Sequence, residues 1–415
     1  MYIKRIYLKN IRCFDELEIK FDKIGNSVLI LGDNGDGKST LLKSLAIGLC
    51  DESSAAGLHR ELPGELVRKS AKEPGSIIIE LENQKSKYKI KTSIESLPSF
   101  EFIKQRVYLD SKKTNQKSFP WSDIFVCGYG PGRQTQGTAD LEEYAAVDAV
   151  YTLFRYYDPM QNSELAIRRL VEKARSRVGK NNPAEKEKRA NQMLDTIQVL
   201  LKKVLNLSEK DKIFITPTGI DIKSHWGRNR LSSLGDGYKA TVTWIMDFLS
   251  WRMLSGKSLN PKTMDGIVII DEIEQHLHPR WQINIMRLLQ ESFPKVQFIA
   301  TTHSPLVASG CKCAVYALKH GQRETTENVY GWLAEDVYRY MGLPSSRPKK
   351  FKEEIIDKYR ILYRKKIGKK LSKDEKKEIK FLRQSLDSLP GSDPIALSTE
   401  LNSLADELKS IKGNT

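Results

Sequence analysis

Residues 32–40, Gly-Asp-Asn-Gly-Asp-Gly-Lys-Ser-Thr, decide the fold of this 415-residue chain. They satisfy the pattern G-x-x-x-x-G-K-[ST], in which a glycine-rich loop joins a buried strand to a helix and binds phosphate groups. An apolar run at residues 27–31 precedes the loop, and apolar residues at helical spacing follow it to about residue 50. The sequence therefore predicts a nucleotide-binding loop in an α/β fold.

Each residue type in this loop has a chemical purpose. Glycines allow successive backbone N–H groups to point at one phosphate, and the start of the following helix adds the positive end of its dipole. Lys38 can neutralise the β- and γ-phosphates, and the Ser39 hydroxyl can bind Mg²⁺. We therefore expect ATP and Mg²⁺ as ligands, with nucleotide contacts from Gly32, Asn34, Gly35, Gly37, Lys38, Ser39 and Thr40.

A second apolar run ends in two carboxylates. Residues 266–270 are Gly-Ile-Val-Ile-Ile, which is typical of a central parallel strand, and Asp271 and Glu272 follow directly. Ligands collect at the carboxyl ends of such strands. We expect Asp271 to bind Mg²⁺ through its water shell, and Glu272 to act as general base toward a water that attacks the γ-phosphate.

A third apolar run, residues 297–302, ends at His303. A histidine at this edge can donate a hydrogen bond to the γ-phosphate or hold the attacking water, whereas the alternative is a core histidine without a catalytic role. We interpret His303 as catalytic, together with Glu272 and Lys38. We interpret His276 and His278 as dimer-contact or helix-capping residues, because nothing else near them in the sequence suggests a metal site.

The charge is concentrated near the C-terminal end. The formal net charge is +16, and residues 341–383 contain sixteen Lys or Arg against six Asp or Glu. Apolar residues recur there at helical intervals, so residues 347–383 are predicted to form a basic amphipathic helix that binds nucleic acid. Docking of a protein partner and a plain solvated surface remain the alternatives.

Other features favour a soluble cytoplasmic protein without a membrane partner. No apolar run reaches the roughly 18 residues that span a bilayer, and residues 1–6 alternate like an edge strand rather than a signal peptide. The five cysteines are scattered, which is typical of a reducing compartment without a disulfide framework. We interpret Cys311 and Cys313 as small core residues rather than as a zinc pair.

The order of these motifs resembles a known family. The phosphate-binding loop, a glycine-rich stretch at residues 231–240, the Asp-Glu strand end and the histidine resemble the ABC-type ATPases of the SMC and RecF group. Residues 272–282, with their His-Leu-His-Pro step, are most similar to the OLD ATPases and their relatives, which include the Septu-type anti-phage defence ATPases. The resemblance covers about residues 1–50, 120–135 and 228–345.

The resemblance implies an ATP molecule sandwiched between two heads, and therefore a homodimer or higher homo-oligomer. It places Lys38, Ser39 and Thr40 at phosphate and Mg²⁺, Asp271 at Mg²⁺, Glu272 as the base and His303 as the switch. The family signature, which closes the site from the partner head, corresponds to Gly235, Asp236 and Gly237. The signature usually offers a serine where Gly235 stands, so Ser233 or Ser232 is expected to substitute. Gln134 is the candidate for the Mg²⁺-sensing glutamine, with Arg133 as an alternative, and Arg12 is a further expected nucleotide contact.

The predicted fold class is an α/β ABC-type P-loop ATPase head, with a mixed central sheet, N-terminal antiparallel strands, a helical insertion and a basic helical C-terminal region. The expected boundaries are 1–140 for the lobe with the phosphate-binding loop, 141–210 for the helical insertion, 211–345 for the second lobe and 346–415 for the basic region. The insertion is interpreted as an arm or lid, with a solvated surface bundle as an equal alternative, and its helical pattern is expected to break near residues 158–159 and 182–183. Residues 51–75, which contain Gly57, Pro63, Gly64 and Pro74 among many charges, are expected to form a loop-rich insertion.

The expected function is that of an ATPase whose head dimer regulates a separately encoded effector, expected to be a nuclease, in anti-phage defence. OLD nucleases carry a metal-binding Asp-x-Asp pair after the histidine, and this chain has none there, so it is not expected to be the nuclease itself. The alternatives are a RecF-like DNA repair ATPase and a nucleotide-sensing scaffold with little hydrolysis.

Overall fold

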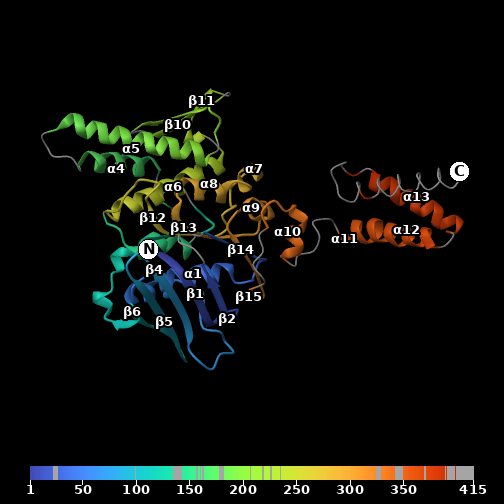
Figure 1. Cartoon of the computed structure of the whole chain (residues 1–415), viewed down its shortest axis with the longest axis horizontal. Helices are drawn as coiled ribbons and strands as arrows, with labels where there is room; N and C mark the ends of the chain where they lie inside the picture. The colour runs from blue at the N-terminus through green and yellow to red at the C-terminus, as the bar shows by residue number, and fades with distance from the viewer. Residues whose placement is uncertain are drawn as a thin grey trace. The chain divides into compact units, whose positions relative to one another are not determined.

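The computed structural model describes residues 1–398 except for 22–26, 99, 134–142, 156–157, 159, 161–162, 177–181, 206, 217–218, 225–226, 234, 324–328, 342–348, 369–370, 388 and 390–397. The chain divides into two compact units, Met1–Gly342 and Leu343–Thr415. Each unit is considered by itself below (Figure 1).

The first sheet of the larger unit is antiparallel and has the strand order β2-β1-β4-β5-β6-β7. Burial alternates along its strands, as in β4, where Ile77, Ile79 and Leu81 face the core and the residues between them face outward. One face is therefore packed and the other is open, as is common for antiparallel sheets. The strands are β1 (Tyr2–Ile11), β2 (Phe14–Lys20), β4 (Gly75–Glu82), β5 (Lys87–Leu97), β6 (Phe100–Leu109) and β7 (Lys112–Thr114).

The second sheet has the order β15-β14-β3-β13-β12-β8. Five of its strands are parallel and only β15 pairs antiparallel. Because β3 pairs with β13 and β13 pairs with β12, the carboxyl ends of these three strands meet at one edge. The strands are β3 (Val28–Leu31), β8 (Val126–Tyr129), β12 (Asp265–Ile270), β13 (Lys295–Thr302), β14 (Ala314–Lys319) and β15 (Gln322–Arg323).

One buried amide joins the two sheets. Gln297, on β13, is fully buried. Its Oε1 accepts the Ile3 N–H at 2.7 Å and its Nε2 donates to the Ile3 carbonyl at 3.1 Å. This side chain therefore pairs with the backbone of β1 as a neighbouring strand would.

Helix α1 (Lys38–Gly48) begins at the phosphate-binding loop and contacts strands of both sheets. Helix α2 (Glu52–Arg60) follows directly, although the sequence had suggested a loop-rich insertion over residues 51–75. The helix forms because the Asp51 carboxylate caps it, accepting the N–H groups of Ser53 and Ser54 at 3.1 and 3.2 Å.

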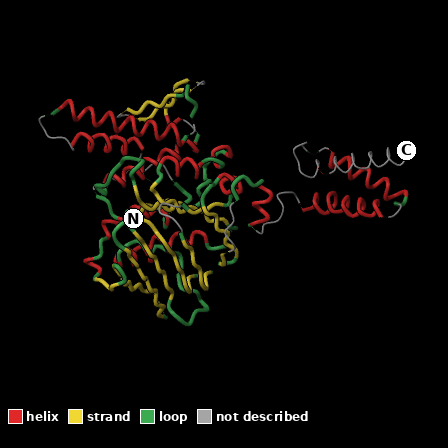
Figure 2. The backbone as a smooth tube through the Cα atoms, viewed as in Figure 1, coloured by secondary structure: helices red, strands yellow, loops and turns green. Residues whose placement is uncertain are grey.

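The helical insertion lies beside the second lobe, as Figures 1 and 2 show. Helices α4 (Ser163–Ser176) and α5 (Pro183–Val204) contact each other, α4 contacts α6 (Asp236–Leu254), and α5 contacts α8 (Ile285–Ser292). The predicted break near residues 182–183 is the start of α5, where the Asn182 side chain accepts the Glu185 N–H. A three-stranded antiparallel sheet adjoins them, made of β9 (Lys212–Thr216), β10 (Gly219–Ser224) and β11 (Gly227–Arg230).

The remaining elements of this unit are short. They are α3 (Ala146–Val150), α7 (Pro279–Gln282), α9 (Pro305–Gly310), α10 (Ala334–Tyr340) and the 3-10 turns Gln116–Ser118, Trp121–Asp123, Tyr151–Leu153 and Leu231–Ser233.

The cysteine prediction is wrong in one respect. Cys311 and Cys313, between α9 and β14, form a disulfide with their Cα atoms 5.4 Å apart. The chain turns at this point, which brings two cysteines separated by one residue within bonding reach. The other three cysteines are free.

The smaller unit contains α11 (Lys349–Phe351), the π-helical turn Lys352–Asp357, α12 (Lys358–Gly368) and α13 (Lys373–Asp387). Ile356, Tyr359, Leu362, Leu382 and Leu386 form its apolar core. Over the described parts of both units, no helix combines the length and apolar character needed to cross a bilayer.

Candidate nucleotide-binding and catalytic site

The phosphate-binding loop follows β3 and ends in the first turn of α1. Gly37 precedes the helix with φ 95°, a left-handed backbone that favours glycine. A Cβ atom at this position would lie 2.3 Å from Cys13 Sγ and 2.7 Å from Phe14 Cζ. The loop backbone can therefore lie against the β1–β2 turn only because residue 37 has no side chain.

A cavity of about 300 Å³ lies at this loop. Most of the site residues predicted from the sequence line this cavity. They come from the phosphate-binding loop, the β1–β2 turn and the ends of β12 and β13. Its lining includes Arg12, Asn34, Gly35, Gly37, Lys38, Ser39, Thr40, Glu272 and His303.

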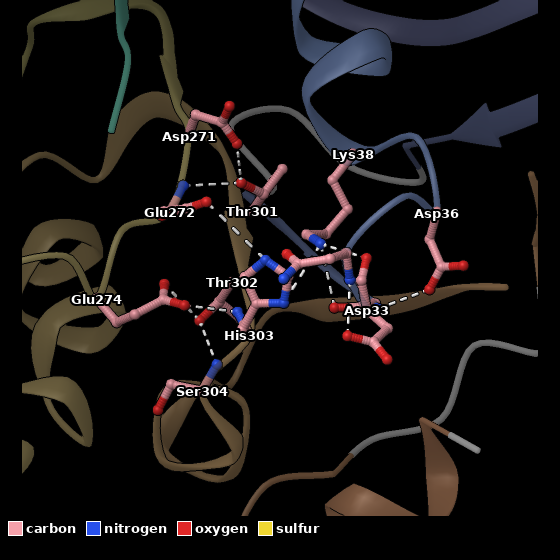
Figure 3. Close-up of polar contacts among 12 residues, drawn as sticks. Asp33, Asp36, Lys38, Asp271, Glu272, Glu274, Thr301, Thr302, His303 and Ser304 are labelled. Carbon is pink, nitrogen blue, oxygen red and sulfur yellow. Dashed lines mark hydrogen bonds and ion pairs between the residues drawn. The ribbon is translucent and has the colours of Figure 1, made fainter. Parts of the chain in front are cut away.

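Lys38 points into the loop that precedes it (Figure 3). Its Nζ donates to the carbonyl oxygens of Gly32 and Asp33 at 3.1 and 2.8 Å and lies 3.4 Å from His303 Nδ1. Burial lowers the pKa of Lys38, while the carboxylates of Asp271, Asp36, Glu272 and Glu274 oppose that shift. A cation so placed can neutralise phosphate oxygens at the loop.

The end of β12 is tied to β13 through one hydroxyl group. Thr301 Oγ1 donates to Asp271 Oδ1 at 2.5 Å and accepts the Glu272 N–H at 2.8 Å. Asp271 is thereby fixed in the interior, with 2% of its surface exposed.

Glu272 turns away from the strand toward the cavity. Its φ is 47°, which is unfavourable for a residue with a Cβ and is characteristic of constrained functional positions. Burial raises the pKa of Glu272, and the neighbouring Asp271 carboxylate adds to the increase. A carboxylate with a raised pKa is better suited to accept a proton from water.

A buried guanidinium holds this strand end in place. Arg133 donates through Nη2 to the carbonyl oxygens of Asp271 and Glu272 at 2.8 and 2.6 Å, and through Nη1 to those of Ile273 and Gln275 at 3.4 and 3.5 Å. Burial lowers the pKa of Arg133 to about 10. Arg133 was the alternative candidate for a contact to Mg²⁺ or the nucleotide. Its side chain does not line the cavity and instead binds the backbone carbonyl groups that follow β12.

His303 Nδ1 faces the ammonium group of Lys38 at 3.4 Å. Because an ammonium group only donates, this contact suits the His303 tautomer that accepts at Nδ1 and carries its hydrogen on Nε2. Nε2 lies 4.0 Å from Glu272 Oε1, and the two side chains are 30% and 32% exposed. In that tautomer His303 presents an N–H donor beside the Glu272 carboxylate, and both residues line the cavity.

Glu274 anchors the end of β13. Its Oε1 accepts the His303 N–H at 2.6 Å and its Oε2 accepts the Thr302 hydroxyl at 2.7 Å. The sequence analysis did not select Glu274, Thr301 or the backbone-binding role of Arg133. For Glu274 a signal existed, because Asp271, Glu272 and Glu274 place three carboxylates within four residues of a strand end.

The predicted signature residues lie away from this cavity in their own chain. Ser233 is exposed, and its hydroxyl donates to the Arg230 carbonyl at 2.7 Å. Gly235 precedes α6, and a Cβ there would meet no atom within 4 Å, whereas one at Gly237 would lie 2.3 Å from the His276 carbonyl oxygen. Gln134 lies outside the described residues, as do the side chains of Ser232 and Asp236.

Two further residues that the sequence analysis selected, Arg12 and His278, form hydrogen bonds with the backbone. Arg12 lines the cavity while its guanidinium donates to the carbonyl oxygens of Glu65 and Pro63 at 3.1 and 2.8 Å. His278 Nδ1 accepts the Arg280 N–H at 3.3 Å at the start of α7. The capping interpretation of His278 is therefore confirmed.

The donor set suits Mg²⁺ at the phosphate side of the cavity. Mg²⁺ prefers oxygen ligands and keeps several waters, so one hydroxyl and one carboxylate are sufficient protein ligands. Ser39 lines the cavity. Asp271 is not among the residues that line it, but its carboxylate lies directly before Glu272, with Oδ1 oriented by Thr301. Ser39 would bind the ion directly and Asp271 through water, and the ion would neutralise charge on the phosphate oxygens.

A phosphate-binding loop after a parallel strand, faced by neighbouring strands that end in Asp-Glu and in histidine, defines a P-loop ATPase head. Residues 27–309 match the family AAA_21, described as "AAA domain, putative AbiEii toxin, Type IV TA system". This match covers more than half of the chain, and the chain belongs to that family.

The chain is also similar to individual proteins. It is 27% identical to the Septu protein PtuA of Bacillus mycoides over 93% of this chain and 50% of that protein. It is 26% identical to the "Retron Vc95 probable ATPase" of Vibrio cholerae over 85% of this chain and 82% of that protein. Among solved structures, an SMC head bound to the C-winged helix domain of ScpA matches with a TM-score of 0.49 at 13% identity, over 79% of this chain and 98% of that one. The chain thus spans about half the length of the Septu relative.

Proposed function

We propose that this protein hydrolyses ATP at the cavity beside Lys38. The observation that carries the proposal is the convergence of Lys38, Glu272 and His303, from three different strand ends, on one cavity. Lys38 neutralises the β- and γ-phosphates in this scheme. Glu272 accepts a proton from a water that attacks the γ-phosphorus, the bond to the bridging oxygen breaks, and ADP and phosphate leave. The His303 Nε2–H donates to a γ-phosphate oxygen and stabilises the charge that develops there.

We further propose that each ATP is closed by a second copy of the chain. Ser233, Gly235 and Gly237 do not line the cavity of their own chain, and the start of α6 at Gly235 has open space around it. The signature of one head is therefore free to approach the phosphate-binding loop of another. Such an arrangement makes a symmetric dimer with two composite sites.

Complementation between two inactive variants tests this arrangement. Lys38→Ala removes the phosphate-binding lysine but leaves the signature, and Gly235→Glu alters the signature where the structure has room for a side chain. Each variant alone is expected to be inactive. An equimolar mixture of exchanging dimers should regain about a quarter of wild-type activity, because half of the dimers are mixed and each has one intact site. Two inactive variants that stay inactive when mixed, although exchange is demonstrated, would contradict the shared site.

The biological role that we propose is control of a separately encoded effector, such as a nuclease, in anti-phage defence. The support is the similarity over most of the chain to a Septu protein and to a retron ATPase. Mass photometry of the native assembly with and without ATP tests it. A second polypeptide that copurifies with the oligomer is the expected result, whereas a monomer that dimerises only with ATP and DNA would favour a RecF-like maintenance role.

A further inference from the structure

We propose that the open face of the antiparallel sheet binds the phosphodiester backbone of a nucleic acid. The relevant surface, here called the basic face, lies on β5, β6 and β7. Residues 85–113 contain eight Lys or Arg against three Asp or Glu, and one of those acids, Glu101, is turned inward to the Leu66 and Val67 N–H groups. The side chains that define the basic face are Lys87, Lys89, Lys91, Lys104, Arg106 and Lys113.

Strand register sets these cations side by side. Lys91 lies directly opposite Arg106, and Lys89 and Lys113 lie on either side of Tyr108. Like charges opposite each other on neighbouring strands destabilise a sheet. The fold therefore carries an unfavourable arrangement at Lys91 and Arg106 that an anionic ligand would relieve.

Ion pairs within the protein leave part of this charge uncompensated. Glu80 lies 3.8 Å from Lys89, and Glu95 lies 3.2 Å from Lys104. Within the described residues, Lys91, Arg106 and Lys113 have no acidic side chain within ion-pair distance. Three adjacent strands thus present at least three cations without an ion-pair partner among the residues that the structure describes.

The other end of the same sheet behaves differently. On β1 and β2, Arg5 pairs with Glu18 and Glu80, Lys20 pairs with Glu18, and Lys9 pairs with Glu73. The basic face is therefore a local feature of β5–β7 and not a uniform consequence of the high net charge. A hollow of about 590 Å³ lies there, and its lining includes Lys87, Lys89, Lys91 and Tyr108 together with the acidic Glu80 and Glu82.

A nucleic acid fits this surface better than an acidic protein does. Outward side chains repeat about every 7 Å along a strand and about 5 Å between strands, so the cations form a regular array that suits repeated phosphates. Protein interfaces depend on buried aromatic or aliphatic anchors. The exposed large apolar side chains nearest in sequence, Leu97 and Phe100, lie at the β5–β6 turn and not among these cations. Tyr108, between Lys89 and Lys113, offers a ring for base stacking.

The test compares two double variants of the full chain. Lys91→Gln/Arg106→Gln removes two of the three unpaired cations, and Lys9→Gln/Lys20→Gln removes the same charge from the paired end of the same sheet. Fluorescence anisotropy with labelled single-stranded and double-stranded DNA, over a series of salt concentrations, is the measurement. We expect the first variant to lose about tenfold in affinity and about two units in the slope of log K against log salt, and the second to change little.

Further readouts separate this proposal from a general loss of structure. The first variant should retain wild-type ATPase activity and should unfold at the same or a higher temperature, because like-charge repulsion is relieved. Unchanged DNA affinity, an equal loss in the control variant, or a loss of binding to polyglutamate but not to DNA would each overturn the proposal. None of these results depends on ATP hydrolysis, so the function proposed for the cavity is tested separately.

Discussion

The Arg133 guanidinium donates to the main-chain oxygen of Glu272 at 2.6 Å, and both residues have left-handed backbone conformations, with φ of 36° and 47°. Neither conformation is favourable for these residue types. The planar Arg133 guanidinium has several N–H donors and binds four backbone carbonyl oxygens at once. Arg133 is therefore a positioning residue, which sets the direction in which the Glu272 side chain leaves the strand.

Substitution of Arg133 tests that role. Arg133→Lys keeps the charge but lacks the planar fork, and a small displacement of a catalytic group lowers the rate steeply, so we expect kcat to fall by roughly tenfold to a hundredfold. KM for ATP should change by less than about threefold, because Arg133 does not line the cavity. Arg133→Met should lower kcat further. Arg155→Lys, at an exposed arginine paired with Glu61, is the control; a rise in KM without loss of kcat would contradict the positioning role.

Glu272→Gln removes the proposed base while it preserves the shape of the side chain. Loss of general-base catalysis typically costs 10² to 10⁴ in rate, so we expect kcat to fall by about that factor with ATP binding retained. Steady-state turnover and the binding of a fluorescent ATP analogue measure the two effects. Glu16→Gln, at an exposed carboxylate on β2, is the control, and wild-type turnover in Glu272→Gln would exclude Glu272 as the base.

The pH dependence of kcat should reveal the environment of Glu272. The base acts only when ionised, and burial together with Asp271 raises its pKa above the ordinary value of 4.5. Activity is therefore expected to decline on acidification at a pH higher than an exposed glutamate would produce. In His303→Gln the same acidic limb should remain at a lower overall rate. Its disappearance would assign the limb to His303 instead.

Asp265 should contribute stability that is lost in acid. Burial alone would raise the pKa of Asp265, but hydrogen bonds from the Met1 amine and Arg252, both at 2.7 Å, outweigh it and hold the pKa at about 2. Because the folded pKa is below the unfolded value of 3.8, the stabilisation is complete above about pH 4 and disappears toward pH 2. Asp265 is partly exposed, so Asp265→Asn should cost only about 1 kcal/mol at pH 7.

Urea unfolding at several pH values measures this difference. The free energies of wild type and Asp265→Asn should converge as the pH falls toward 2. Asp15→Asn, at an exposed position on β2, is the control and should leave the curve unchanged. A constant difference between wild type and Asp265→Asn at all pH values would show that ionisation of Asp265 is not the cause.

The predicted binding of nucleic acid by the lysines of the smaller unit can be tested separately. Neutralising Lys365, Lys366, Lys369 and Lys370 should weaken nucleic-acid binding and flatten its salt dependence. Lys365 forms an ion pair with Glu375 on α13, so Lys365→Gln should also lower the stability of that helix pair. If DNA affinity is unaffected by all four changes, docking of a protein partner becomes the better interpretation.

The strand ends that meet at the cavity could be predicted from sequence because they follow a local rule. Uninterrupted apolar runs ending in polar residues identified the strands before Asp271 and His303, and the glycine pattern identified the loop before Lys38. Contacts between a side chain and a distant backbone could not be found in this way. Arg133 binds carbonyl groups about 140 positions away in sequence, and nothing beside it in the sequence indicates those partners.

Two local features were also missed. Helix α2 depends on one capping carboxylate, Asp51, within a stretch whose glycine and proline content favoured a loop. The Cys311–Cys313 disulfide depends on the turn between α9 and β14, since the spacing of two cysteines in sequence does not determine their separation in space.

Gln297 has a mechanical consequence. It holds the backbone of Ile3 through two hydrogen bonds, and the strand that carries it, β13, ends directly before His303. Strand β1 is in turn paired with β4, and β4 with β5. Hydrogen bonds therefore connect the outer strands of the antiparallel sheet, through the Gln297 amide, to the strand that ends at His303. A force applied to those outer strands would be transmitted along this connection to the position of His303.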